Sequence, residues 1–287
     1  DAGQSVWIDF IRRALLDSGA LERLVREDGV AGVTSNPTIF EKAIGGSADY
    51  DAQIRRVLSE EPGIDPHELF ERVALDDIRA ACDVLRPVFE RTGGADGFVS
   101  FEVPPSLADD TAATVSQAQR LWRAIDRPNA MIKVPATPAG IPAIEELIAA
   151  GVNVNVTLMF SLDHYERVAQ AYIRGLHRRR DLAGAASVAS FFVSRVDSVV
   201  DKALEKIGTP EALALRGRAA IANSRLVYRR FREIFDGEPF AALREKGARP
   251  QRPLWASTST KNPDYRDVVY VEELVAPRTV NTVPPAT

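Results

Sequence analysis

The sequence predicts a parallel (β/α)8 barrel of the TIM-barrel type, a single α/β domain over residues 1–287. Short apolar or β-branched runs alternate along the chain with longer amphipathic stretches, which is typical of parallel β/α units. The chain of 287 residues holds eight such runs, and this number favours a closed barrel over an open doubly wound sheet. No glycine-rich dinucleotide-binding or P-loop fingerprint follows any run.

The expected strands occupy residues 5–10, 31–35, 97–102, 130–135, 152–158, 186–192, 252–257 and 279–283. Clear helical patterns cover residues 108–124, 162–176 and 218–235. Asp109 and Asp110 are placed to start the first of these helices and Ser161 to cap the second. Prolines 62 and 66 divide the chain after the second strand into two helical pieces. The sequence stops where an eighth helix would begin, so that helix is expected to be absent.

Composition and charge indicate a globular protein and argue against several classes of partner and site. A hydrophobic content of 45% and a charged content of 26% are those of a globular protein with a substantial core. The net charge of -4 and the scattered basic residues argue against nucleic acid as a partner. No apolar run reaches the length of a membrane span. Cys82 is the only cysteine and falls on the apolar face of a helix, which fits a reducing cytoplasm. The three histidines do not cluster, so no metal site is expected.

Polar side chains stand at the ends of most predicted strands. The carboxyl ends of the strands and the loops that follow them build the active site of such a barrel. These side chains are therefore expected around one cavity. They are Asp9, Thr34, Asn36, Glu102, Lys133, Asn155, Thr157, Ser190, Arg195, Ser257 and Lys261.

Lys133 is the strongest catalytic candidate. It lies in an apolar strand between Ile132 and Val134, and strand alternation turns it toward the barrel axis when its neighbours face the helices. Burial disfavours the charged form of an amine, so a lysine at this position is expected to serve as a neutral nucleophile. The alternative is a lysine that pairs with Glu102 or Asp9 and only fills the barrel.

Glu102 and Asp9 are candidate proton-transfer groups. Formation and breakdown of a carbinolamine require proton transfer to and from oxygen, and cleavage of a C–C bond requires a base at a substrate hydroxyl. The alternative for each carboxylate is a structural hydrogen bond to a helix N-terminus. Asn153 and Asn155 are unusual in an otherwise apolar strand, and one of the pair is expected to point inward. Thr157 shares the face of Asn155.

Arg195 and Lys261 supply positive charge beyond the sixth and seventh strands, where Ser257 and backbone N–H groups can add donors. Barrels of this type commonly hold phosphate near their last strands. The sequence therefore predicts a phosphate site here, with surface salt bridges as the alternative for the two cations.

Four segments together resemble the transaldolase family, in the family's order and over essentially the whole chain. They are Gly-Val-Thr-Ser-Asn-Pro-Thr-Ile-Phe at 32–40, Ile-Lys-Val-Pro-Ala-Thr at 132–137, Asn-Val-Thr-Leu-Met-Phe-Ser at 155–161 and Ser-Phe-Phe-Val-Ser-Arg at 190–195. One region departs from the family pattern. The run from Ala256 to Asn262 is two residues longer than the Ala-Ser-Phe-Arg-Asn of some relatives, with Lys261 in place of the arginine.

The resemblance implies a cofactor-free Schiff-base mechanism of the pentose phosphate pathway. Lys133 would attack the ketone of fructose 6-phosphate or sedoheptulose 7-phosphate. Glu102, with a water near Thr157, would shuttle protons, and Asp9 would take the C4-hydroxyl proton as the C3–C4 bond breaks. The dihydroxyacetone unit would then pass to glyceraldehyde 3-phosphate or erythrose 4-phosphate.

The remaining site residues receive binding roles from the same resemblance. Thr34, Asn36 and Asn155 would hold substrate hydroxyls, Ser190 and Phe192 would line the cavity, and Arg195 would clamp the phosphate together with Ser257 and Lys261. The expected partners are sugar phosphates, without nucleic acid or membrane, and the expected assembly is a monomer or homodimer. Two alternatives stay open. One is a fructose 6-phosphate aldolase, in which the Glu102 position is typically a glutamine. The other is a non-catalytic sugar-phosphate-binding barrel.

Overall fold

The strands close into one parallel barrel in chain order. The structure is a computed structural model that describes residues 2–285 and 287, and among these the strands run from β1 to β8 around a closed sheet. Each expected run coincides with one strand, so the predicted barrel is confirmed. The strands are β1 (Ser5–Ile8), β2 (Gly32–Thr34), β3 (Phe98–Glu102), β4 (Ala130–Pro135), β5 (Val154–Met159), β6 (Ser187–Phe192), β7 (Arg252–Ala256) and β8 (Val280–Val283).

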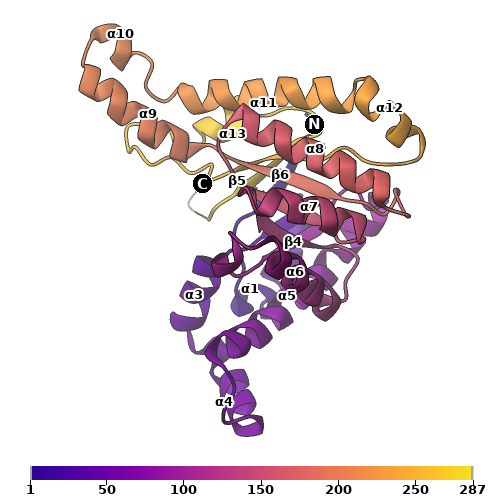
Figure 1. The fold of residues 1–287 in the computed structure, drawn as a ribbon. Coiled ribbons are helices and arrows are strands. Elements are labelled where there is room, and N and C mark those ends of the chain that lie inside the picture. The colour runs from indigo at the N-terminus through magenta and orange to yellow at the C-terminus, as the bar shows by residue number, and fades with distance from the viewer. Residues whose placement is uncertain (1, 286) are drawn as a thin grey trace.

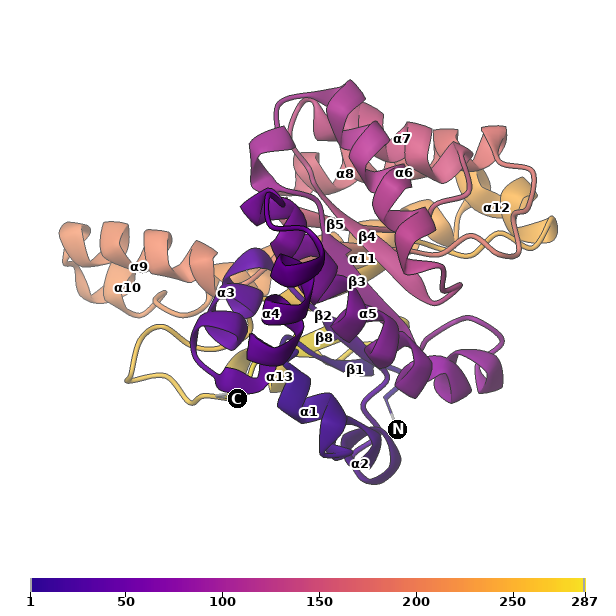
Figure 2. The same cartoon turned by 90° about the horizontal axis from the view of Figure 1, so that it is seen from below.

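The helices surround the sheet, and α9 and α10 project from its side (Figures 1 and 2). The expected caps are present, because Asp110 accepts a hydrogen bond from Ala113 N at 2.9 Å and Ser161 from His164 N at 3.2 Å. The α-helices are α1 (Arg13–Asp17), α2 (Ala20–Glu27), α3 (Pro37–Gly45), α4 (Asp51–Glu60), α5 (Pro66–Arg91), α6 (Thr111–Ile125), α7 (Gly140–Ala149), α8 (Leu162–Arg178), α9 (Ser194–Ile207), α10 (Pro210–Leu213), α11 (Ala219–Phe235), α12 (Glu238–Glu245) and α13 (Val269–Glu273). Two short 3-10 helices, η1 (Ala48–Tyr50) and η2 (Pro105–Leu107), complete the described elements.

Strand alternation divides the side chains between two environments. Ile132 and Val134 of β4 face outward into the apolar layer beneath the helices. Inward-facing residues at the start of the strands form a second apolar cluster that fills the lower barrel, including Trp7, Phe98 and Met131. Two residues further along most strands the same inward face becomes polar, as at Lys133 above Met131. The barrel therefore has a closed apolar floor and a polar upper end.

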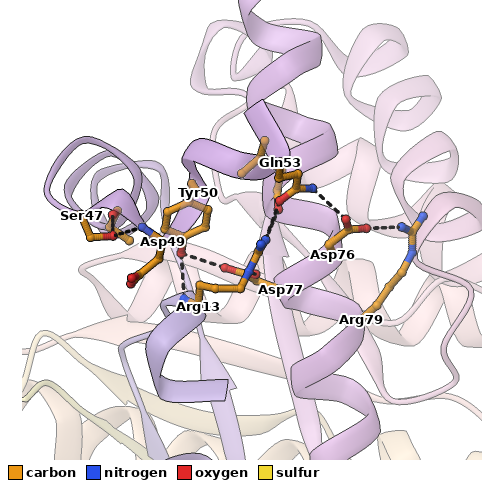
Figure 3. A network of polar contacts seen from close by, with 10 residues as sticks. Arg13, Ser47, Asp49, Tyr50, Gln53, Asp76, Asp77 and Arg79 are labelled. Atoms are coloured by element: carbon orange, nitrogen blue, oxygen red, sulfur yellow. Dashed lines mark hydrogen bonds and ion pairs between the residues drawn. The ribbon is translucent and has the colours of Figure 1, made fainter. Parts of the chain in front are cut away.

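The chain between β2 and β3 is anchored to α1 by a partly buried ionic network (Figure 3). Asp77 of α5 is 1% exposed and accepts hydrogen bonds from Arg13 Nε at 2.5 Å and from Tyr50 Oη at 2.8 Å. Arg13 also donates to Gln53 Oε1, and the Gln53 amide donates to Asp76. Burial raises the pKa of Asp77, whereas the hydrogen bonds from Arg13 and Tyr50 lower it. The ionised carboxylate therefore depends on these two partners.

We expect Asp77→Asn to lower the free energy of unfolding by about 3 kcal/mol, because the partly buried Arg13 guanidinium loses the charged partner that α5 holds in the interior. Denaturant titration measures this as a lower midpoint with an unchanged slope. Asp83→Asn on the same helix is the matched control, since its ion pair with Arg127 is largely exposed and should contribute less than about 1 kcal/mol. Equal midpoints for the two variants would contradict a structural role for the Asp77 network.

Candidate active site

A cavity of about 630 Å³ opens at the carboxyl end of the barrel. Its wall includes every residue proposed from the sequence except Asn155: Asp9, Thr34, Asn36, Glu102, Lys133, Thr157, Ser190, Phe192, Arg195, Ser257 and Lys261. Parallel strands end at the same edge of the sheet, which explains why residues from seven separate parts of the chain meet here.

Lys133 lies at the base of this cavity and is 7% exposed. Its Nζ is 3.0 Å from Glu102 Oε2 and donates a hydrogen bond to the Ser35 carbonyl at 2.9 Å. The pairing with Glu102 is the contact expected of a lysine that merely fills the barrel. The open volume beside it shows that the barrel is not filled, because the amine borders space that a small molecule can enter.

The contact between Glu102 and Lys133 follows from strand register. β3 and β4 are neighbours, and Glu102 is the direct partner of Lys133 in the parallel ladder, as Lys133 is of Asn155. Glu102 and Lys133 project to the same side, so their charged groups meet. A proton that leaves the ammonium can pass to Glu102 within hydrogen-bond distance and leave a neutral amine.

Asp9 follows β1 and is held by two threonines rather than by Lys133. Thr34 Oγ1 donates to Asp9 Oδ1 at 2.6 Å and lies 2.7 Å from Thr282 Oγ1. Since Thr34 has one hydroxyl proton, Thr282 donates to Thr34 when Thr34 donates to Asp9. The two threonines therefore orient the Asp9 carboxylate at the cavity wall.

Asn155 sits inside the barrel but does not border the cavity. Its amide donates to Ser100 Oγ at 2.9 Å and accepts from Ser190 Oγ at 2.6 Å. Asn155 thereby fixes Ser190, which does line the cavity. A direct contact between Asn155 and a substrate stays a prediction.

Asn36 lines the cavity and also begins α3. Its side-chain oxygen accepts a hydrogen bond from Ile39 N at 3.0 Å, so the carboxamide is held as the cap of the helix. The amide N–H₂ group remains the donor with which Asn36 can meet a substrate hydroxyl.

The positive side of the cavity is formed by Arg195 and Lys261. The Arg195 guanidinium lies over the Phe192 ring at 4.9 Å, and Lys261 Nζ donates to Ser259 Oγ at 2.8 Å. In the described part of the chain neither cation pairs with a carboxylate, so the surface salt bridges that the sequence left open are not what is observed. Both side chains remain available to an anion.

Sequence reasoning missed several residues of the cavity wall. Neither Thr282 nor Lys42 was singled out, although both line the cavity. Ile39 and Lys42 are three residues apart on α3, and this helical spacing after Asn36 was an available signal. Leu158 has a left-handed backbone with φ 63° and lies where the pairing of β5 with β6 shifts register. Such an irregularity next to Thr157 is common at functional sites, but no local residue pattern announces it.

Residues 2–285 and 287 contain neither a metal-binding cluster nor a membrane-spanning helix. No group of three or more His, Cys, Asp or Glu side chains there is arranged to hold a metal ion. No helix within the same range is long and apolar enough to cross a membrane.

Comparison with known proteins gives consistent results. The model of a family described as transaldolase/fructose-6-phosphate aldolase matches residues 6–287. A transaldolase of Mycobacterium ulcerans is 53% identical over 291 residues, which cover 100% of this chain and 78% of the relative. Transaldolase 1 of Streptomyces coelicolor is 54% identical, and the match covers 100% of this chain and 76% of the relative. A transaldolase of Thiobacillus denitrificans is 50% identical, over 99% of this chain and 80% of the relative.

Proposed function

The chain belongs to the transaldolase/fructose-6-phosphate aldolase family, and from this premise we propose that Lys133 carries a dihydroxyacetone unit as a Schiff base between two sugar phosphates. The reaction class is that of a transaldolase. Relatives that bear this name are 50–54% identical to the protein over essentially the whole chain. One observation carries the assignment of the nucleophile. Lys133 Nζ lies 3.0 Å from Glu102 Oε2 at the base of an open polar cavity.

The first half of the reaction forms the Schiff base. Lys133 transfers a proton to Glu102 and attacks the C2 carbonyl carbon of fructose 6-phosphate or sedoheptulose 7-phosphate. The carbinolamine loses its hydroxyl as water after protonation by Glu102, through a water held near Thr157, and the iminium remains. Thr157 lines the cavity next to these groups, which supports this placement.

The second half breaks and remakes a C–C bond. Asp9 accepts the C4-hydroxyl proton, the C3–C4 bond breaks, and its electron pair delocalises into the iminium as an enamine. The aldose phosphate leaves, glyceraldehyde 3-phosphate or erythrose 4-phosphate enters, and the steps reverse with ping-pong kinetics. The hydrogen bond that Thr34 donates to Asp9 at 2.6 Å supports this role, because it leaves the other carboxylate oxygen to accept a proton.

Binding roles follow the positions around the wall. Arg195, Ser257 and Lys261 receive the phosphate, because uncommitted cations and a hydroxyl gather on one side of the cavity. Thr34, Asn36 and Ser190 meet the sugar hydroxyls, Asn155 supports Ser190 from below, and Phe192 closes the apolar part of the wall.

Supplying fructose 6-phosphate with and without erythrose 4-phosphate tests the proposal. We expect sedoheptulose 7-phosphate to accumulate only with the acceptor, and little free dihydroxyacetone to form without it. The carboxylate of Glu102 favours transfer over hydrolysis, since aldolases of the family typically carry a glutamine there. Rapid release of dihydroxyacetone without acceptor would instead establish fructose 6-phosphate aldolase activity.

The proposal extends to the setting of the enzyme. We place it in the pentose phosphate pathway of the cytoplasm, as a single domain over residues 1–287 in a monomer or homodimer. Cys82 supports a reducing compartment only weakly. It is buried and free, and burial raises the pKa of its thiol to about 12, so it behaves as a core side chain rather than a reactive one.

A further inference from the structure

One face of α9 carries three buried polar side chains that the reaction does not use. Ser194, Asp197 and Asp201 are spaced by three and four residues, so they line up along one side of the helix. Asp197 is 1% exposed and Asp201 is 7% exposed. Carboxylates are rarely buried to this extent unless they are fully hydrogen-bonded, so each needs identified partners.

All three side chains bind the segment that follows β7. Ser194 Oγ lies 2.9 Å from Ser257 Oγ, and Ser194 N donates to the Ser257 carbonyl at 3.1 Å. Tyr270 Oη donates to Asp197 Oδ2 at 2.7 Å, and Tyr265 Oη donates to Asp201 Oδ2 at 2.6 Å. These contacts join α9 to the 257–268 loop and to the start of α13 at three positions along the helix.

The second oxygen of each carboxylate is bound from the opposite side. Asp197 Oδ1 accepts from Ala220 N at 2.7 Å, and Asp201 Oδ1 accepts from Gly217 N at 3.0 Å. Burial and the neighbouring Asp201 raise the pKa of Tyr265 to about 12, so its hydroxyl stays protonated and donates at neutral pH. The two aspartates therefore tie three separate segments into one rigid unit.

This unit holds the two cations of the phosphate side. Arg195 follows Ser194 on α9, and Lys261 lies four residues before Tyr265 in the 257–268 loop. Lys261 borders both the main cavity and a smaller one, of about 300 Å³, that Asp197, Asp201 and Tyr265 line. A freed loop could turn Lys261 toward these carboxylates and away from the phosphate. Because the tyrosine hydroxyls already hydrogen-bond to the two aspartates, these carboxylates do not draw Lys261 away, and it stays at the main cavity.

We propose that Asp201 and Tyr265 are positioning residues for phosphate recognition, which set the placement of Lys261 relative to Arg195. The inference rests on the proposed function, because it assumes that the anion bound by these cations is the substrate's phosphate. It assigns a purpose to the lengthened run between Ala256 and Asn262. Ser257 and Thr258 hold the start of this loop, and the contact of Tyr265 with Asp201 holds it beyond Lys261.

Gly217 supports this role of Tyr265 independently. It has φ +70° and its backbone packs against the tyrosine ring, where an added Cβ would lie 2.9 Å from ring carbon Cζ. Gly217→Ala should therefore displace Tyr265 without removing its hydroxyl. The two substitutions, Tyr265→Phe and Gly217→Ala, reach the same loop by different routes.

The test compares Tyr265→Phe with wild type in steady-state kinetics and in calorimetric titration with inorganic phosphate. We expect KM for glyceraldehyde 3-phosphate and Kd for inorganic phosphate to rise together, about three- to tenfold, as for loss of one hydrogen bond. In Tyr265→Phe, kcat and the KM for unphosphorylated glyceraldehyde should both stay within about twofold of wild type. Gly217→Ala should shift the same two constants in the same direction. Tyr172→Phe is the matched control, since its hydroxyl binds the Arg249 carbonyl before β7, at the other end of the barrel, and should change neither constant.

Two outcomes would overturn the proposal. One is an unchanged Kd for inorganic phosphate in Tyr265→Phe. The other is an equal loss with glyceraldehyde and glyceraldehyde 3-phosphate, which would indicate general destabilisation. If wild type itself transferred no dihydroxyacetone, the proposed function would fail, and the phosphate titration would still decide the positioning role.

Discussion

Lys133→Ala is expected to lower transfer activity by about 10⁴- to 10⁶-fold, because it removes the amine at the base of the cavity and with it the covalent route. Lys42 and Lys261 also border the cavity, but both side chains are exposed at its rim. Among the described residues, neither lysine forms an ion pair with a carboxylate of the kind that Lys133 forms with Glu102.

Borohydride reduction in the presence of fructose 6-phosphate measures the intermediate directly. Wild type should gain the mass of one reduced substrate fragment on the peptide that contains Lys133, and Lys133→Ala should gain none. Lys42→Ala is the matched control and should still be labelled. An adduct of normal yield in Lys133→Ala would remove this residue from the mechanism.

Glu102→Gln is expected to slow Schiff-base formation by about 10²- to 10³-fold, the range for loss of a positioned acid or base. The amide keeps the shape of the side chain but cannot accept the Lys133 proton across the 3.0 Å contact. The phosphate side of the cavity lies on other elements, so Kd for inorganic phosphate should be unchanged.

Single-turnover trapping with fructose 6-phosphate separates this effect from binding. Glu145→Gln serves as the control, because Glu145 lies on α7 and forms ion pairs with Arg174 and Arg178 of α8 rather than with Lys133. If the Glu102 variant formed its adduct at the wild-type rate, Glu102 would have no part in proton transfer, and the contact with Lys133 would be only structural.

The strands and their inward positions could be predicted from sequence because both depend on local pattern. Eight short apolar runs separated by amphipathic helices indicate the barrel, and period-two alternation places Lys133 opposite Ile132 and Val134. Polar residues that follow the strands then identify most of the cavity wall. These features require only that each residue be compared with its near neighbours in the chain.

Contacts between distant residues could not be predicted in this way. The ladder register decides that Glu102 meets Lys133 and that Asp9 is held by Thr34 instead. The same closure of the sheet buries Asn155 between Ser100 and Ser190, and these hydrogen bonds could not be predicted from the sequence.

The sequence by itself determined the barrel, the inward lysine and the carboxyl-end location of the site, since strand period and strand order suffice for all three. Only the tertiary structure decided which side chains touch, including Tyr265 with Asp201 across 64 residues. The physical reason is that barrel closure and helix packing set distances between segments, and these arise from the packing of the whole core rather than from any local pattern.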